Sequence, residues 1–143
     1  VLTTDEIYES FLGDASRTFF HGHSYTANPL CAAAALANLE LMDERDTVAH
    51  AAWIGRTLGD LLKPLEADGR VLEIRRIGTM TGIEVVPNGE RTGFRVCTAA
   101  REHGVITRPL GDVVILMPPL GITEPDLQQL VAAIRHGMDS VYA

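Results

Sequence analysis

Two pairs of short, β-branched segments constrain the fold of this chain more than any other feature. The first pair is VLEIRRIG (71–78) and TMTGIEVVP (79–87), and the second is VITRP (105–109) and DVVILMPP (112–119). Glycine or proline bounds each segment, and the members of a pair adjoin or nearly adjoin, which is typical of strands joined at a tight turn. The sequence therefore predicts a small, mostly antiparallel sheet.

Helical patterns stand before, between and after these strands. They cover 28–45, 47–66, 93–103 and the segment from Thr123 onward. The last of them has the clearest apolar stripe, which comprises Leu127, Leu130, Val131, Ile134, Met138 and Val141. Helices gathered on one side of an antiparallel sheet define an α+β fold, so we expect one α+β domain preceded by a helix and a loop.

Residues at the predicted helix ends support this division. Asn28 is a preferred N-cap, and Pro29 suits the first helical position because its missing N–H would have no partner there. Gly104 can close the helix at 93–103 as a C-cap. Thr4 can cap a short helix near the beginning of the chain, as far as Phe11.

Composition and charge exclude several classes of protein. Twelve basic and nineteen acidic residues give a net charge of −7, which argues against a nucleic-acid or anionic-membrane surface. We expect no membrane span and no signal peptide, because no apolar run is long enough. The two cysteines form no CxxC motif, which favours a reducing cytosol and a cytoplasmic protein. The chain begins without methionine, and its first residues read like part of a longer protein.

The loop HGHSYTANP, residues 21–29, is unusually rich in polar side chains. His21 and His23 form an HxH pair that can ligate zinc, but no third ligand has a recognisable spacing, which favours ordinary hydrogen bonding. Ser24 and Thr26 precede a helix, where small hydroxyls and backbone N–H groups can hold a phosphate. The alternative is that these hydroxyls only cap the helix.

The basic residues offer one further candidate and one absence. Arg108 stands at a strand end and can hold a carboxylate through two hydrogen bonds, or can equally be a surface arginine or part of an internal salt bridge. Arg75 and Arg76 are adjacent in a strand, so their side chains point to opposite faces. The only lysine, Lys63, lacks the setting that an amine nucleophile needs, and no catalytic residue is assigned in this chain.

Two segments carry a resemblance to a known family. HGHSYTANPL and the alanine-rich helix after it resemble the cofactor loop of the class III (subgroup II) pyridoxal-phosphate aminotransferases, whose pattern is roughly HG-x-[ST]-x-x-x-[NH]-P. TRPLGDVVILMPPLGIT, residues 107–123, is similar to the members that convert 8-amino-7-oxononanoate to 7,8-diaminononanoate in biotin biosynthesis. The resemblance covers essentially the whole chain, as the C-terminal portion of a fold-type I PLP-dependent transferase. It implies that 1–46 end the large, cofactor-binding domain and that 47–143 form the small α+β domain.

The resemblance implies pyridoxal 5'-phosphate as cofactor and gives four residues roles. His23 and Ser24 correspond to the pair that contacts the cofactor phosphate, in the partner subunit's site of a homodimer with shared active sites. Gly22 corresponds to the position whose backbone approaches the substrate, and Arg108 to the residue that holds the substrate carboxylate. Many members have Pro-Thr in place of His23-Ser24, and some have an aromatic residue in place of Ile115.

The resemblance also implies what this chain lacks. The lysine that binds the cofactor covalently, the Schiff-base lysine, lies upstream, so the isolated chain is expected to be inactive. The amino donor is S-adenosylmethionine in most of these relatives and lysine in some. Two other functions stay open: another class III ω-aminotransferase, acting on ornithine, 4-aminobutyrate or a polyamine, and a non-catalytic binding or assembly module.

Overall fold

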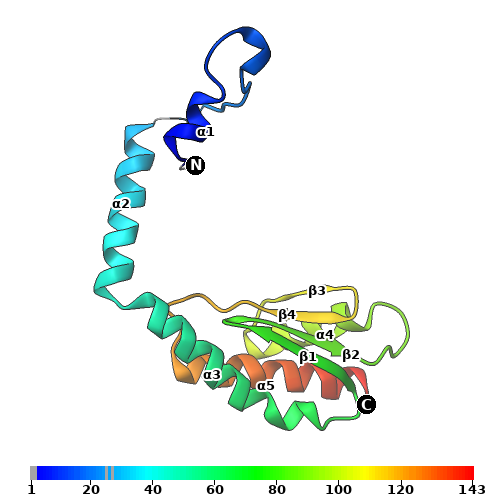
Figure 1. The fold of residues 1–143 in the computed structure, drawn as a ribbon. Coiled ribbons are helices and arrows are strands. Elements are labelled where there is room, and N and C mark those ends of the chain that lie inside the picture. The colour runs from blue at the N-terminus through cyan, green and yellow to red at the C-terminus, as the bar shows by residue number, and fades with distance from the viewer. Residues whose placement is uncertain (1–2, 25, 27) are drawn as a thin grey trace. The chain divides into compact units, whose positions relative to one another are not determined.

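The chain divides into two units, Val1–Leu41 and Met42–Ala143. The computed structural model, drawn in Figure 1, describes residues 3–24, 26 and 28–143. In this described part, no helix has both the length and the apolar character needed to cross a membrane.

The second unit is built on a four-stranded sheet with the order β1-β2-β4-β3. Its strands are β1 (Val71–Ile77), β2 (Met80–Val85), β3 (Arg108–Leu110) and β4 (Val113–Leu116). Each neighbouring pair is antiparallel. This confirms the predicted antiparallel sheet.

Three helices cover one face of this sheet and leave the other open (Figure 1). They are α3 (Thr47–Glu66), α4 (Thr92–Ala100), continued by the 3₁₀ turn η2 (Arg101–His103), and α5 (Glu124–Val141). Gly104 follows η2 with a φ of 75°, as expected of a C-cap glycine. Thr123 caps α5 by accepting a hydrogen bond from the amide of Asp126.

The core of this unit lies between the helices and the covered face of the sheet. Alternate residues of β2 and β4 point into it, because side chains alternate between the faces of a strand. The buried side chains include Ile54, Leu58 and Leu62 of α3, Ile83 and Val85 of β2, Val114 and Leu116 of β4, and Leu127, Ile134 and Met138 of α5. In 47–66 the residues at helical spacing that the sequence predicts to be buried are Val48, Ala51, Ala52, Leu58, Leu62 and Leu65, but Val48 and Ala52 are exposed. Leu58, Leu62 and Leu65 are buried as predicted, and Ile54 completes the buried stripe.

The second pair of strands is shorter than the sequence predicts. The ladder between β3 and β4 begins at Leu110–Val113 and ends at Arg108–Ile115, so Val105–Thr107 are not paired. The Thr107 hydroxyl donates a hydrogen bond to the Ile115 carbonyl at the end of the ladder. Pro118 and Pro119 follow β4 and have no N–H to extend it.

The first unit contains α1 (Asp5–Glu9), the 3₁₀ turn η1 (Ala15–Arg17) and most of α2 (Pro29–Glu44). Thr4 caps α1 as predicted, but α1 ends at Glu9, before Phe11. Among the described residues of these helices none is buried. A helix that is apolar all round needs other protein around it, and α2 exposes Leu30 by 80%, Leu36 by 62% and Leu39 by 58%.

Candidate functional site

The loop before α2 contains a tight turn with Ser24 at its corner. The amide of Thr26 donates to the carbonyl of His23 at 3.0 Å, and the amide of His23 donates to the Thr26 hydroxyl at 3.3 Å. Two hydrogen bonds between the same residues fix the turn and present Ser24, whose side chain is exposed. Tyr25 and Ala27 of the same motif lie outside the described residues.

A row of aromatic rings leads along the first unit to this turn. Ring centroids are separated by 5.6 Å between Phe11 and Phe19, by 5.4 Å between Phe19 and His21, and by 6.4 Å between His21 and His23. These spacings lie in the range of favourable ring contacts. His21 therefore serves as a packing partner that supports His23. In the part of the chain that the structure describes, no group of three metal-ligating side chains is present.

The donors available to a phosphate belong to the turn rather than to the helix. Asn28 caps α2, since its side-chain oxygen accepts from the amides of Leu30 at 2.9 Å and Cys31 at 3.2 Å. These amides are therefore already satisfied, and Pro29 has none. The Ser24 hydroxyl remains as a donor that the turn exposes, and His23 lies next to it in the same turn.

Local charge agrees with an anion at this turn. The sequence has no aspartate or glutamate from residue 15 to residue 39, although the whole chain has a net charge of −7. Arg17 is the charged side chain of that stretch. A phosphate dianion bound at this turn would therefore not be repelled by a carboxylate of the neighbouring sequence. The local charge is compatible with the phosphate group of a cofactor.

Arg108 lies in the second unit, at the beginning of β3, and its side chain is exposed. It shares the open face of the sheet with Leu110 of the same strand and with its cross-strand partner Ile115. Within the described ranges, no carboxylate lies within ion-pair distance of Arg108. An internal salt bridge was one of the two ordinary explanations for this arginine, and the described residues contain none that involves it.

The other two strand arginines are already engaged. Arg75 points to the open face, where it pairs with Glu73 and also with Glu84, the latter at 2.7 Å. These carboxylates raise the pKa of Arg75, chiefly through the hydrogen bond to Glu84. Arg76 points to the helices and donates to the carbonyl of Gly55 at 2.7 Å. The prediction that these two side chains take opposite faces is confirmed.

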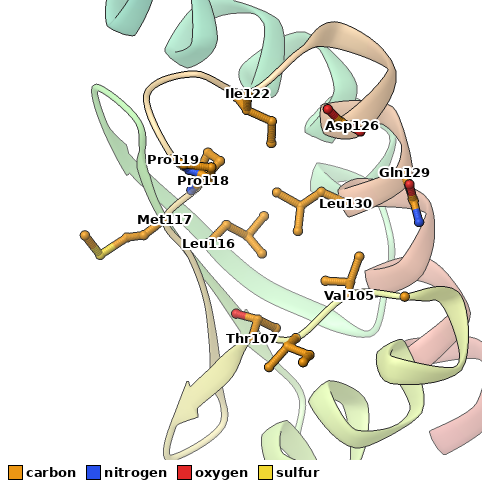
Figure 2. A pocket seen from close by; sticks show the side chains of 12 residues that line it. Val105, Thr107, Leu116, Met117, Pro118, Pro119, Ile122, Asp126, Gln129 and Leu130 are labelled. Atoms are coloured by element: carbon orange, nitrogen blue, oxygen red, sulfur yellow. The ribbon is translucent and has the colours of Figure 1, made fainter.

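Two of the hollows in the described part of the chain are lined by residues of β4, on opposite faces of the sheet. One, of about 320 Å³, lies on the open face and is lined by apolar side chains that include Leu110, Val113 and Ile115. The other, of about 270 Å³, lies on the helix side, between the end of β4 and the beginning of α5 (Figure 2). The polar side chains at its edge already make hydrogen bonds within the protein. The Thr123 hydroxyl donates to the Asp126 carboxylate, and the Gln129 amide donates to the carbonyl of His103. The hollow on the open face lies on the same side of the sheet as Arg108, because it is lined by Ile115, the cross-strand partner of Arg108.

Neither Lys63 nor Cys97 offers a nucleophile. Lys63 is exposed and bonded to Asp60 at 2.6 Å, and this hydrogen bond raises the pKa of the Lys63 amine. A nucleophilic amine needs a lowered pKa. Burial raises the pKa of the Cys97 thiol to about 11, which keeps it protonated.

The structure thus places the predicted residues in two groups. Gly22, His23 and Ser24 are consecutive at one turn of the first unit, and Arg108 lies on the sheet of the second unit. Gly82 and Val113, on the open face beside Ile115, were not singled out by sequence reasoning. The alternation of side chains along a strand was the available signal, since it puts Val113 and Ile115 on the same face.

Comparison with known proteins gives one consistent family. The family model for class-III aminotransferases matches residues 1–138. The adenosylmethionine-8-amino-7-oxononanoate aminotransferase of Nitratidesulfovibrio vulgaris is 46% identical, over 98% of this chain and 28% of that protein. The protein of the same name from Anoxybacillus flavithermus is 38% identical, over 96% of this chain and 33% of that protein.

Solved structures agree with these sequence relatives. The crystal structure of adenosylmethionine-8-amino-7-oxononanoate aminotransferase from Methanocaldococcus jannaschii matches with a TM-score of 0.87 and 35% identity, over 99% of this chain and 35% of that chain. The omega transaminase from Pseudomonas jessenii, in complex with PMP, matches with a TM-score of 0.80 and 30% identity, over 85% of this chain and 29% of that chain. The chain therefore spans only 28% to 35% of the length of these relatives.

Proposed function

Because this chain belongs to the class III aminotransferase family, we propose that it is the C-terminal part of a transaminase that converts 8-amino-7-oxononanoate to 7,8-diaminononanoate in biotin biosynthesis. The observation that carries the proposal is the identity of 46% and 38% to two adenosylmethionine-8-amino-7-oxononanoate aminotransferases over nearly the whole chain. The geometry of Arg108 supports it. An exposed guanidinium without an ion pair among the described residues, next to an apolar sheet face, suits a substrate with one carboxylate and an aliphatic chain.

The cofactor of this enzyme is pyridoxal 5'-phosphate, and this chain contributes to the phosphate site. The Ser24 hydroxyl would donate a hydrogen bond to the phosphate, and His23, at the same turn, would lie beside it. Gly22 precedes them and lets the backbone approach the substrate. When bound, pyridoxal phosphate acts as an electron sink that stabilises a carbanion, and the lysine that holds it lies outside this chain.

The division of the chain follows from these roles. Residues 1–46 belong to the end of the large, cofactor-binding domain, and 47–143 form the small domain that carries Arg108. The enzyme is a cytoplasmic homodimer in which His23 and Ser24 serve the active site of the partner subunit. The exposed apolar side chains of α2 support this assembly, because a helix of that character is stable only when other protein covers it.

Turnover by the full-length protein tests this function. We expect it to form 7,8-diaminononanoate from 8-amino-7-oxononanoate with S-adenosylmethionine or lysine as amino donor, measured by mass spectrometry of the product. Ornithine, 4-aminobutyrate and a polyamine serve as competing substrates. A full-length protein that uses one of these and leaves 8-amino-7-oxononanoate unchanged belongs to a different branch of the family.

A second candidate is another ω-aminotransferase, which one comparison favours. A protein of Caulobacter vibrioides named omega-aminotransferase is 32% identical over 99% of this chain. The third candidate, a non-catalytic assembly module, predicts no cofactor absorbance in the full-length protein. The visible absorbance of bound pyridoxal phosphate separates that candidate from both enzymes.

Replacement of Ser24 tests the phosphate site. We expect Ser24→Ala in the full-length protein to weaken pyridoxal-phosphate binding by about tenfold, because one hydrogen bond to a charged group is lost. Dialysis against buffer without cofactor, followed by absorbance, measures the retention. Ser24→Thr keeps a hydroxyl and should retain the cofactor.

A matched control for this replacement is Ser16→Ala. The Ser16 hydroxyl bonds Asp14 in the turn η1, outside the loop that presents Ser24. If Ser24→Ala and the unsubstituted protein bind the cofactor with equal affinity, Ser24 does not contact the phosphate.

A further inference from the structure

Three residues in consecutive register form a line across the open face of the sheet. Arg108 of β3 pairs with Ile115 of β4, and Ile115 pairs with Gly82 of β2. Neighbouring strands lie about 4.8 Å apart, so Gly82 is about 10 Å from Arg108 along this line. A carboxylate held at Arg108 therefore has Ile115 and then Gly82 directly beside it on the sheet.

The missing side chain of Gly82 keeps this part of the face hollow. A Cβ atom at this position would lie 3.0 Å from Cγ1 of Val113 and 4.0 Å from Cδ1 of Ile115. Both neighbours line the hollow of about 320 Å³, as does Gly82 itself. Any side chain at position 82 would consequently take up space between Val113 and Ile115.

The walls of the hollow are mostly apolar, and the two arginines that line it are already hydrogen-bonded, Arg75 to Glu84 and Arg76 to the carbonyl of Gly55. Apolar side chains make up most of its lining, namely Ile77, Met80, Leu110, Val113 and Ile115. Arg75, the cross-strand partner of Gly82, is held by Glu73 and Glu84. A second carboxylate arriving there would compete with two carboxylates of the protein, whereas an aliphatic chain would replace water on apolar surface.

We propose that Gly82 and Ile115 form the floor on which the aliphatic chain of the substrate lies when Arg108 holds its carboxylate, so that these two residues set the chain length that the enzyme accepts. This rests on the proposed function, since it uses Arg108 as the carboxylate site. It selects monocarboxylates with a long apolar chain over short ones and over dicarboxylates. Substrate selection by this hollow is distinct from the contact that anchors the carboxylate.

Binding of straight-chain carboxylates to the full-length holoenzyme tests the proposal without requiring turnover. Isothermal calorimetry gives the Kd of pentanoate and of nonanoate. We expect nonanoate to bind at least about tenfold more tightly than pentanoate, because additional methylenes leave water. In Gly82→Val, which puts a branched side chain into the hollow, the preference should fall below about threefold.

Three further variants separate the role of Gly82 and Ile115 from the carboxylate contact of Arg108 and from effects on stability. Gly82→Ala requires only a small shift of Val113 and should give an intermediate preference, so the test does not depend on the larger substitution. Ile83→Val changes the neighbouring buried residue on the helix side and should keep the full preference. Arg108→Ala should weaken the binding of pentanoate and of nonanoate by a similar factor, so the ratio of their Kd values should not change.

The outcomes distinguish this proposal from the proposed function. An unchanged nonanoate preference in both Gly82 variants, or no preference in the unsubstituted enzyme, overturns the role of the hollow. In a different outcome, the enzyme fails to convert 8-amino-7-oxononanoate and still shows a chain-length preference that Gly82→Val abolishes. This result overturns the proposed substrate but supports the floor formed by Gly82 and Ile115.

Discussion

Replacing Arg108 with alanine in the full-length protein should lower kcat/KM for 8-amino-7-oxononanoate by about a hundredfold. The variant leaves the substrate carboxylate without its cation, a loss of about 3 kcal/mol for a charge pair inside a binding site. The exposed side chain of Arg108 makes no ion pair with any carboxylate among the described residues, so its removal leaves no unpaired acid in this part of the chain. Steady-state kinetics with varied 8-amino-7-oxononanoate measures the effect.

Two controls assign this loss to the carboxylate. An acceptor that lacks the carboxylate should react at similar rates with Arg108→Ala and the unsubstituted enzyme, because neither forms the contact. Arg56→Ala removes another exposed arginine, on α3, and should leave kcat/KM unchanged. A loss of the same size with the acceptor that lacks the carboxylate would show that Arg108 acts on the structure and not on that group.

Replacing Gly137 with alanine should destabilise the small α+β unit by about 2 to 3 kcal/mol. A Cβ atom at this buried position of α5 would lie 2.4 Å from the backbone carbonyl oxygen of Val96 in α4, and a backbone atom cannot move aside alone. Alanine would otherwise favour a helix by about 1 kcal/mol over glycine. The clash forces α4 and α5 apart, and overpacking of this kind outweighs the gain in helix propensity.

Urea denaturation of the 143-residue chain measures this effect. Its single tryptophan, Trp53, packs against the core of the unit and reports unfolding by fluorescence. Gly69→Ala is the matched control, because nothing lies within 4 Å of a Cβ built at Gly69. Equal or higher stability of Gly137→Ala would mean that α4 and α5 do not approach each other this closely.

Much of the second unit follows from local patterns. The stripe from Leu127 to Val141 predicts the buried face of α5, and the two pairs of β-branched segments predict an antiparallel sheet. Short turns leave adjacent strands few alternatives to antiparallel pairing. Strand ends were less predictable, because the pairing of Val105–Thr107 depends on the partner strand and not on β propensity alone.

Only part of the candidate site could be predicted from local sequence patterns. Residue types and spacing indicated a phosphate loop at Ser24 and a carboxylate site at Arg108, each beside an ordinary alternative, and the family resemblance gave these residues their roles. The turn that presents Ser24 depends on paired hydrogen bonds between His23 and Thr26, which no local propensity specifies. The capping of α2 by Asn28, in contrast, was predictable because an N-cap involves only neighbours in sequence.

The sequence by itself determined the kinds of elements, their order, the caps of several helices and the family. It did so because helix periodicity, strand alternation and capping act over a few residues. Only the tertiary structure decided that Arg108, Ile115 and Gly82 stand in one line on the open face, while Arg75 is occupied by two carboxylates. Strand order and register set these neighbours, and both are fixed by which faces the core buries across residues far apart in the chain.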